Sequence, residues 1–198
     1  MRKYLLLSLV GLCLFFAGCG DTVSLFPLYS SNVLVNDDTL VGRWEDVDES
    51  GKPEKSPSLF EFTKNDDGYL LVVQDKTKDE ADTIVIQLHL LRLGDKMFVD
   101  FGTPKDSDLK LKRSPYPSIN VHTFGRIWIE KDSMRLELLG SDDNLKSAEV
   151  TGKVKLPYVN AESGLVITAT TEQLQAFARE HADDTSLFSD ETKLRRKR

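Results

Sequence analysis

The longest alternating run of the chain extends from Thr83 to Leu93. A period of two is the pattern of a β-strand that turns one face toward the core. The run therefore predicts a long strand, with the face that begins at Ile84 directed inward. That face holds Ile84, Ile86, Leu88 and Leu90, and the opposite face holds Val85, Gln87, His89 and Leu91.

Shorter segments of the same kind occupy most of the remaining chain, and turn-forming residues separate them. Asn65-Asp66-Asp67-Gly68 is one such turn, because Asn, Asp and Gly tolerate the backbone angles of a tight hairpin. No connection resembles the crossover helix that parallel neighbours need. We expect a mainly β fold, a single antiparallel β-barrel or sandwich of about eight or nine strands. The other expected strands lie within 40–45, 59–63, 69–73, 97–101, 119–130, 134–138, 152–156 and 164–169.

One amphipathic helix is predicted near the C-terminus, after the last expected strand. Thr170 is placed to cap it, with Gln173 as the reciprocal partner of a capping box. The helix would lie on the outside of the sheet with its apolar stripe inward. The stripe consists of Leu174, Phe177, Ala178 and His181. Residues 141–150 leave a second, short helix open.

The first nineteen residues have the plan of an export signal. Arg2 and Lys3 precede an uncharged run from Tyr4 to Phe16, which is too short to span a bilayer. The segment that follows, Phe16-Ala17-Gly18-Cys19, resembles a bacterial lipobox. The resemblance implies cleavage before Cys19, with diacylglycerol on its thiol and an N-acyl chain such as palmitate on its amine. We expect no other cofactor.

Cysteine usage agrees with an acylated N-terminus. The chain has two cysteines, Cys13 and Cys19, and Cys13 would leave with the signal. An internal disulfide and a cysteine-rich metal site are thereby excluded from the mature chain. The predicted organisation is a signal peptide at 1–18, a tether at 19–37, a β-domain with its C-terminal helix at 38–184, and a basic, flexible tail at 185–198. The apolar stretch 25–29 leaves open that the tether packs on the domain, with 33–35 as a short edge strand.

The charge distribution argues against nucleic acid as a partner. The net charge is −6, of which residues 1–18 contribute +2 and the last six residues +5, leaving −13 for residues 19–192. Phosphates require a basic face, which an acidic body does not offer. The basic end is expected to be solvated, or alternatively to touch anionic lipid headgroups.

No group of residues in the sequence forms a recognisable catalytic motif. A Gly-x-Ser-x-Gly elbow and a glycine-rich phosphate loop are both missing. The three histidines, His89, His122 and His181, lack the close spacing of zinc ligands, so no metal site is expected. The sequence therefore predicts a protein that is not an enzyme.

A possible ligand site comes from a second resemblance. Gly42-Arg43-Trp44 on an early strand, with many hairpins and a late helix, is similar to the lipocalin plan, in which such a Trp closes one end of an eight-stranded cup. That plan also places an Arg over the Trp, a role that Arg126 could take. If the domain is a cup, one face of the strand near 121–129 could line it; in a sandwich the same face is half-solvated surface. The candidate ligand-binding residues are Trp44, His122, Phe124, Arg126 and Trp128.

The chain also resembles a family of bacterial lipoproteins of unassigned function. The resemblance implies a lipid anchor and one β-rich domain, but no substrate. Gly20 follows Cys19, where an Asp would signal inner-membrane retention, so the outer membrane is favoured, on its periplasmic face. The expected role is a structural or protein-docking component of the envelope, or alternatively a lipocalin-like carrier of a small apolar or amphiphilic ligand. The resemblance rests on segments 27–29, 40–44, 89–94, 97–101, 121–124 and 170–181.

Overall fold

The computed structural model describes residues 22–54, 57–74, 83–105, 119–150, 152, 155–162 and 164–197. The predicted signal peptide, Cys19 and most of the 102–118 connection lie outside the described residues.

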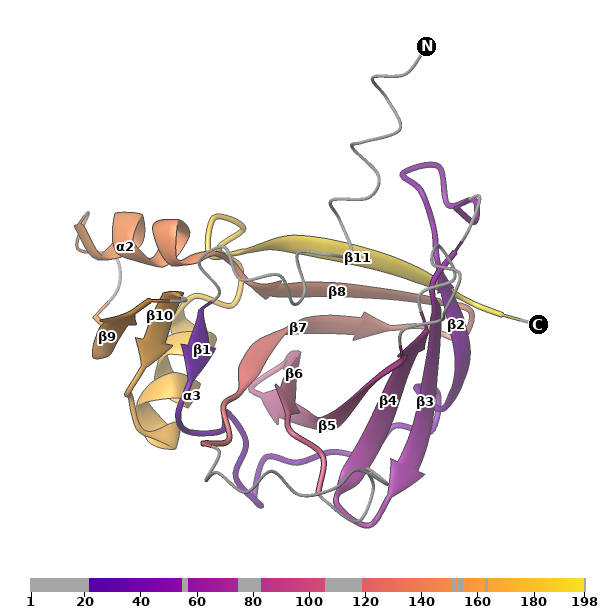
Figure 1. The fold of residues 1–198 in the computed structure, drawn as a ribbon, viewed down its shortest axis with the longest axis horizontal. Coiled ribbons are helices and arrows are strands. Elements are labelled where there is room, and N and C mark those ends of the chain that lie inside the picture. Colours follow the sequence, from indigo (N-terminus) through magenta and orange to yellow (C-terminus); the bar gives the residue numbers. More distant parts are fainter. Residues whose placement is uncertain are drawn as a thin grey trace.

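Eight strands form a closed antiparallel barrel (Figure 1). From β2 to β8 each strand pairs with the next strand in the chain, and β11, the last strand, closes the ring between β8 and β2. The prediction of an antiparallel β-fold is confirmed, and of its two forms the barrel is the one present. The strands are β2 (Gly42–Asp46), β3 (Leu59–Asn65), β4 (Gly68–Gln74), β5 (Thr83–Leu93), β6 (Lys96–Gly102), β7 (Thr123–Ile129), β8 (Ser133–Leu139) and β11 (Phe188–Arg196).

A second layer lies against one side of the barrel. It contains a three-stranded sheet in the order β1 (Val23–Ser24), β10 (Gly164–Ile167) and β9 (Tyr158–Ala161), together with the helices α2 (Asp142–Val150) and α3 (Thr171–Glu180). Figure 1 shows this layer at the left of the barrel, with β11 reaching from it across to the far end. The strand predicted at 152–156 is displaced, since β9 begins only at Tyr158.

Helix α3 begins where the sequence places it. The Thr170 side chain accepts a hydrogen bond from the backbone of Gln173, and the Gln173 side chain accepts one from the Thr170 backbone. Leu174, Phe177 and Ala178 are buried, so most of the predicted stripe faces inward. The capping box and the apolar stripe are confirmed.

The two layers produce two hydrophobic cores, one on each side of the barrel wall. Side chains that point into the barrel form the inner core, which includes Trp44, Leu88 and Ile127. Side chains on the outer face of the wall, such as Leu91 and Phe124, pack against the second layer and form the outer core. Strands β5 and β7 therefore bury residues on both faces.

The predicted flexible tail is wrong, and of the two alternatives for the tether the packed one is present. The expected flexible tail at 185–198 contains β11, which pairs with both β8 and β2. The expected tether is packed from Thr22 onward: β1 pairs with β10, Leu28 is fully buried, and Leu34 bridges to Leu91. Backbone hydrogen bonds to two strand edges hold β11 despite its charged composition, and in the N-terminal segment the burial of Leu28 acts together with such bonds.

Candidate functional site

A buried carboxylate holds the N-terminal segment on the outer face of the barrel. Asp100 on β6 is fully buried. One of its oxygens accepts a hydrogen bond from the Leu28 backbone at 2.7 Å, and the other lies 2.7 Å from Nδ1 of His122. The backbone of His122 in turn pairs with Ser24. Residues 22–35, which we call the N-terminal strap, are thus fastened to strands that are distant in sequence.

His89 lies beside this pair without a hydrogen bond of its own. It stands opposite Asp100 in the β5–β6 ladder and is 3% exposed. The Tyr29 ring of the strap stacks on it, with 3.8 Å between ring centroids. Neither ring nitrogen of His89 has a hydrogen-bond partner among the described residues. Burial lowers the pKa of His89, against the opposing pull of Asp100 and Asp67, so the neutral ring is favoured.

The Asp100–His122 pair holds the strap against the barrel wall through hydrogen bonds. In hydrolases a carboxylate that orients an imidazole serves a nearby nucleophile. Ser24, whose backbone pairs with His122, is fully buried and donates its hydroxyl to the Phe26 carbonyl at 2.8 Å. The hydroxyl is therefore committed to a turn of the strap, and the contacts of the pair among the described residues are with the strap.

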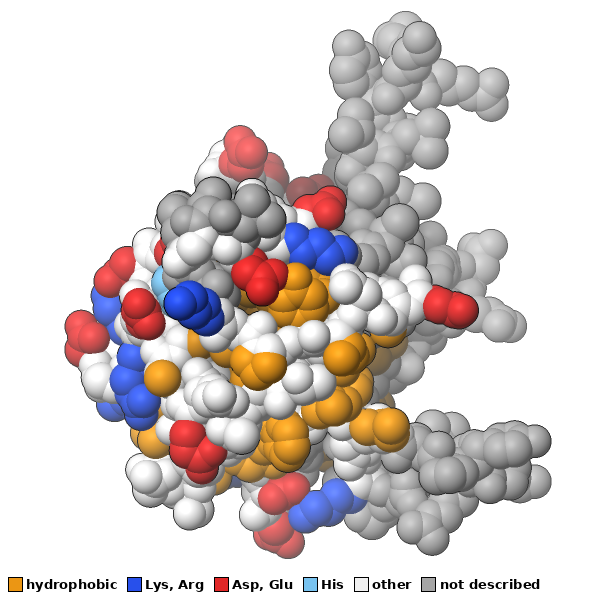
Figure 2. All heavy atoms as spheres, turned by 90° about the vertical axis from the view of Figure 1, so that its left-hand side faces the viewer, with side chains coloured by type: hydrophobic (Ala, Val, Ile, Leu, Met, Phe, Trp, Pro, Cys, Tyr) orange, Lys and Arg blue, Asp and Glu red, His pale blue; other side chains and the backbone are white. Residues whose placement is uncertain are grey.

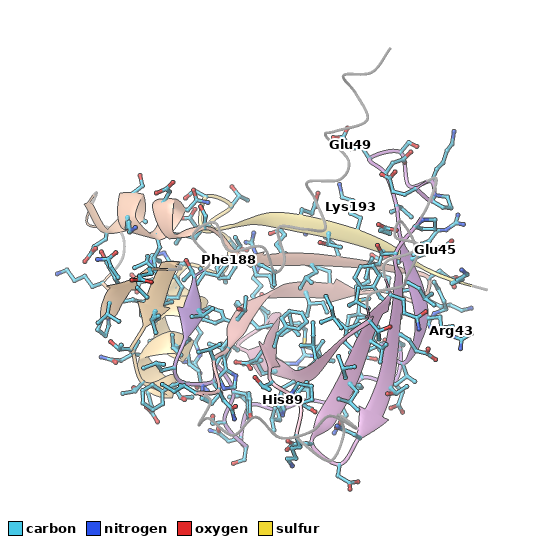
Figure 3. All side chains as sticks on the ribbon, in the orientation of Figure 1. Arg43, Glu45, Glu49, His89, Phe188 and Lys193 are labelled. Atoms are coloured by element: carbon cyan, nitrogen blue, oxygen red, sulfur yellow. The ribbon has the colours of Figure 1, made fainter. Side chains whose placement is uncertain are left out.

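A hollow of about 310 Å³ opens where the strap passes the β3–β4 turn. His89 lies in its wall with Tyr69 and Leu90 of the barrel and Asp67 of the turn. Tyr69 is engaged, because its hydroxyl accepts a hydrogen bond from the Asp37 backbone at 2.7 Å. Figure 3 shows His89 on the side of the barrel that the strap crosses, remote from Arg43 and Glu45.

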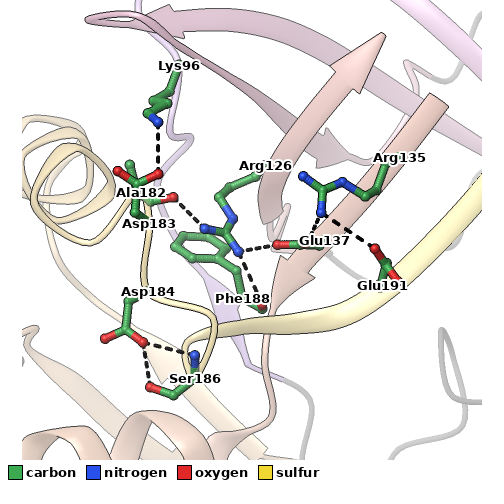
Figure 4. Close-up of polar contacts among 10 residues, drawn as sticks. All are labelled: Lys96, Arg126, Arg135, Glu137, Ala182, Asp183, Asp184, Ser186, Phe188 and Glu191. Carbon is green, nitrogen blue, oxygen red and sulfur yellow. Dashed lines mark hydrogen bonds and ion pairs between the residues drawn. The ribbon is translucent and has the colours of Figure 1, made fainter. Parts of the chain in front are cut away.

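Arg126 fastens the second layer to the barrel at another point of the outer face (Figure 4). Its guanidinium pairs with the buried carboxylate of Glu137 and donates to the carbonyls of Ala182, at 2.5 Å, and Phe188, at 3.4 Å. The Phe188 ring lies 4.9 Å from the guanidinium carbon. Arg126 therefore ties the connection between α3 and β11 to the wall. A second hollow of about 300 Å³ lies beside Arg126 and Trp128.

Trp44 closes the end of the barrel together with Arg196. The Arg196 guanidinium lies 4.3 Å from the Trp44 ring and donates to the carbonyls of Val41, at 3.0 Å, and Thr39. A Cβ at Gly42 would lie 2.7 Å from a nitrogen of that guanidinium, and Gly42 has a φ of +131°. Both facts explain why glycine stands two residues before the tryptophan.

The five predicted ligand residues do not form one site. Trp44 belongs to the inner core, whereas Phe124 belongs to the outer core. His122, Phe124, Arg126 and Trp128 share a face of the strand, as predicted, but this face points away from the barrel interior. The prediction that they line a cup is wrong, because the opposite face, with Ile127, is the inner one. The Arg over Trp44 is Arg196, and the assignment of that role to Arg126 is corrected.

Sequence reasoning missed Asp100 and Arg196. Asp100 lies within the predicted strand 97–101, between Val99 and Phe101, where an acidic residue in an alternating pattern usually indicates a solvated face. It is buried because the strap covers it; one of its oxygens is satisfied by the Leu28 backbone and the other by His122. Arg196 lay in a segment assigned to a flexible tail. The signal that could have found it is Leu194, an apolar residue within a charged run that turns out to face the inner core.

Taken together, the fold is a closed eight-stranded antiparallel barrel with a Trp–Arg closure, an arrangement consistent with a lipocalin-like barrel. Across the described part of the chain, no cluster of His, Cys, Asp and Glu could hold a metal ion. Within the same residues, none of the helices has the length and apolar character needed to cross a bilayer. No protein-family model, curated protein or solved structure matches the chain.

Proposed function

We propose that the protein is a lipid-anchored, non-enzymatic component of a bacterial cell envelope that acts as a rigid docking or structural module. The observation that carries this proposal is the filled interior of the barrel. Aromatic and aliphatic side chains from all around the ring point inward and are almost fully buried. Among them are Trp44, Phe60, Phe62, Tyr69, Leu71, Val73, Leu88, Leu90, Val99, Ile127, Met134 and Leu136. An eight-stranded barrel is narrow enough for side chains alone to fill it.

The packing of the strap supports the same proposal. Asp100, Gln175 and Thr171 all hold the strap through hydrogen bonds to its backbone near Leu28. Only residues 20 and 21 separate an acylated Cys19 from this packed segment. The domain would then sit directly on its membrane, which we expect to be the outer membrane on its periplasmic face. A rigid body held in a fixed position suits docking to another envelope protein.

The anchor is tested by Cys19→Ala, with Cys13→Ala as the matched control. Both changes remove one thiol from the N-terminal region, and only the first removes the proposed acylation site. In cells fed an alkyne-labelled fatty acid, we expect Cys19→Ala to lose the label and to leave the membrane fraction. Cys13→Ala should keep both properties. Continued labelling of Cys19→Ala would refute the anchor.

The alternative is a lipocalin-like carrier, and the barrel with its Trp44–Arg196 closure favours it as a second candidate. The two candidates differ in whether a ligand reaches the interior. Trp128→Phe leaves Trp44 as the only tryptophan, so its fluorescence reports on the inner core. We would use a chain that lacks residues 1–19, since every described contact lies within 22–197.

Titration of this variant with long-chain fatty acids decides between them. A filled barrel predicts no saturable change in Trp44 fluorescence, because the described inward side chains are already packed against one another. Saturable quenching at one ligand per protein would instead establish the carrier. Thermal unfolding of the variant should match that of the parent chain, which shows that the reporter is folded.

A further inference from the structure

The small sheet of the second layer carries no charged side chain. Its strands β1, β10 and β9 have the sequences VS, GLVI and YVNA. In the chain as a whole, 29% of the residues are Asp, Glu, Lys or Arg. A surface sheet in such a chain would ordinarily contain several of them.

The register of the sheet places three valines in a row on its outward face. Val23 stands opposite Val166, and Val166 stands opposite Val159. Residues that stand opposite each other in a ladder share a face. The next residues, Ser24 and Ile167, are fully buried against the barrel side, so the valine row faces outward. Val159 is 52% exposed at the edge of the sheet.

Two further exposed apolar side chains lie close in sequence to the isolated bridge between Ser24 and His122, which joins this sheet to the residues just before β7. Phe26 follows Ser24 by two residues and is 47% exposed, and Ile119 precedes His122 by three residues and is 78% exposed. We call Val23, Phe26, Ile119, Val159 and Val166 the apolar face. Figure 2, which looks onto this side of the molecule, shows hydrophobic side chains gathered in a band.

The apolar face lies next to the proposed anchor. Val23 is the second described residue, and Thr22 before it is 6% exposed and thus held in place. Three peptide units separate Cys19 from Thr22, which limits their Cα distance to about 11 Å. Acyl chains on Cys19 would enter a bilayer within this distance of β1. The sheet face that begins at Val23 is therefore brought to the lipid surface.

We propose that the apolar face rests on the membrane, with Val159 and Phe26 at the boundary between lipid headgroups and acyl chains. This inference rests on the proposed lipid anchor. Apolar side chains gain free energy at that boundary, and a face without charges avoids the cost of desolvating them. The anchor and the face then make two contacts with the same bilayer, and the second contact fixes the orientation of the barrel.

The cysteine content of the chain provides a direct test. Once Cys19 is acylated, a cysteine introduced elsewhere is the only free thiol of the mature protein. We would label Val159→Cys with the fluorophore bimane in the full lipidated protein, reconstituted into vesicles of phosphatidylethanolamine and phosphatidylglycerol. Glu49→Cys is the matched control, since Glu49 is exposed at the far end of the barrel (Figure 3).

Nitroxide-bearing lipids in the same vesicles report which label contacts the bilayer. We expect strong quenching of the label at 159 and little quenching at 49. Equal, weak quenching at both positions, with the protein still floating with the vesicles, would overturn the apolar face and leave the anchor intact. A protein that carries no lipid and does not float would overturn the anchor and this inference together. Phe26→Cys should behave as Val159→Cys does, which guards against a local effect at the sheet edge.

Discussion

At the scale of single residues, Asp46 at the end of β2 is the clearest source of pH dependence. Burial raises the pKa of its carboxyl group to about 6 from 3.8, with smaller contributions from Glu54 and Glu45. One of its oxygens is buried without a hydrogen-bond partner among the described residues. The folded state therefore binds a proton more tightly than the unfolded chain does, and stability falls as pH rises toward and through 6.

We predict that Asp46→Asn stabilises the protein above this pH and has little effect below the unfolded-state value. The amide can keep the backbone hydrogen bonds of the carboxylate but carries no charge to desolvate. The group is only half buried, so solvent screening reduces the gain to about 1 kcal/mol near neutral pH. Urea unfolding at pH 7.5 and at pH 3 measures both values. Equal effects at the two pH values would show that charge burial is not the cause.

Asp100 and Arg126 show why functional interpretation of single residues was difficult. On a solvated strand the charged group of either side chain would contact only water. For Arg126, the pattern of its strand suggested a contact with a ligand. In the structure Asp100 binds the Leu28 backbone, and Arg126 binds the Ala182 carbonyl. Both partners are more than fifty residues away in sequence, and no local pattern encodes them. The sequence shows the type of each residue, but it does not show which distant groups these residues bind.

At the scale of elements, β11 decides whether the barrel closes. It pairs with β8 along most of its length and with β2 at its C-terminal end. Leu194 is buried in the inner core, whereas Arg195 on the opposite face pairs with Glu45 at 2.7 Å. A strand of mixed charge is stable here because its backbone completes two ladders.

We predict that deletion of residues 188–198 unfolds the barrel. The deletion removes β11 and Arg196, leaves the edges of β8 and β2 unpaired, and exposes Trp44. Deletion of Arg198 alone is the control, since it leaves all of β11 in place. Circular dichroism melting and limited proteolysis should show a large loss of stability, more than about 3 kcal/mol, in the first case only. A cooperative melt at the parent temperature after the long deletion would mean that the segment is dispensable.

Strand β7 shows that hydropathy could not indicate which face of a strand points into the barrel. Its two faces were separated correctly by the period of two, since Phe124 and Arg126 lie on one side and Ile127 on the other. Which side faces the barrel could not be read from hydropathy, because the second layer buries the outer face as well. The same double burial applies to β5, where Leu90 faces inward and Leu91 outward.

At the scale of the whole molecule, one barrel wall serves two cores. The inner core fills the barrel, and the outer core joins the wall to α3, the small sheet and the strap. The segment that would follow an acylated Cys19 is part of this outer core, at Leu28. An anchor at Cys19 would thereby be joined to the barrel by a segment that is packed from Thr22 onward, which is the basis for both proposals.

The sequence by itself determined the kinds and order of most elements. Alternation predicted β5 and the hairpins, and the Thr170–Gln173 pair predicted where α3 begins. These features depend on neighbours two to four residues apart, so local side-chain chemistry is sufficient. Only the tertiary structure decided that the sheet closes through β11, that Arg196 lies over Trp44, and that the strap covers Asp100. Each of these contacts joins segments that are far apart in the chain. Each depends on which strand edge lacks a partner strand, or which face of the barrel wall is still uncovered, once the rest of the chain has folded.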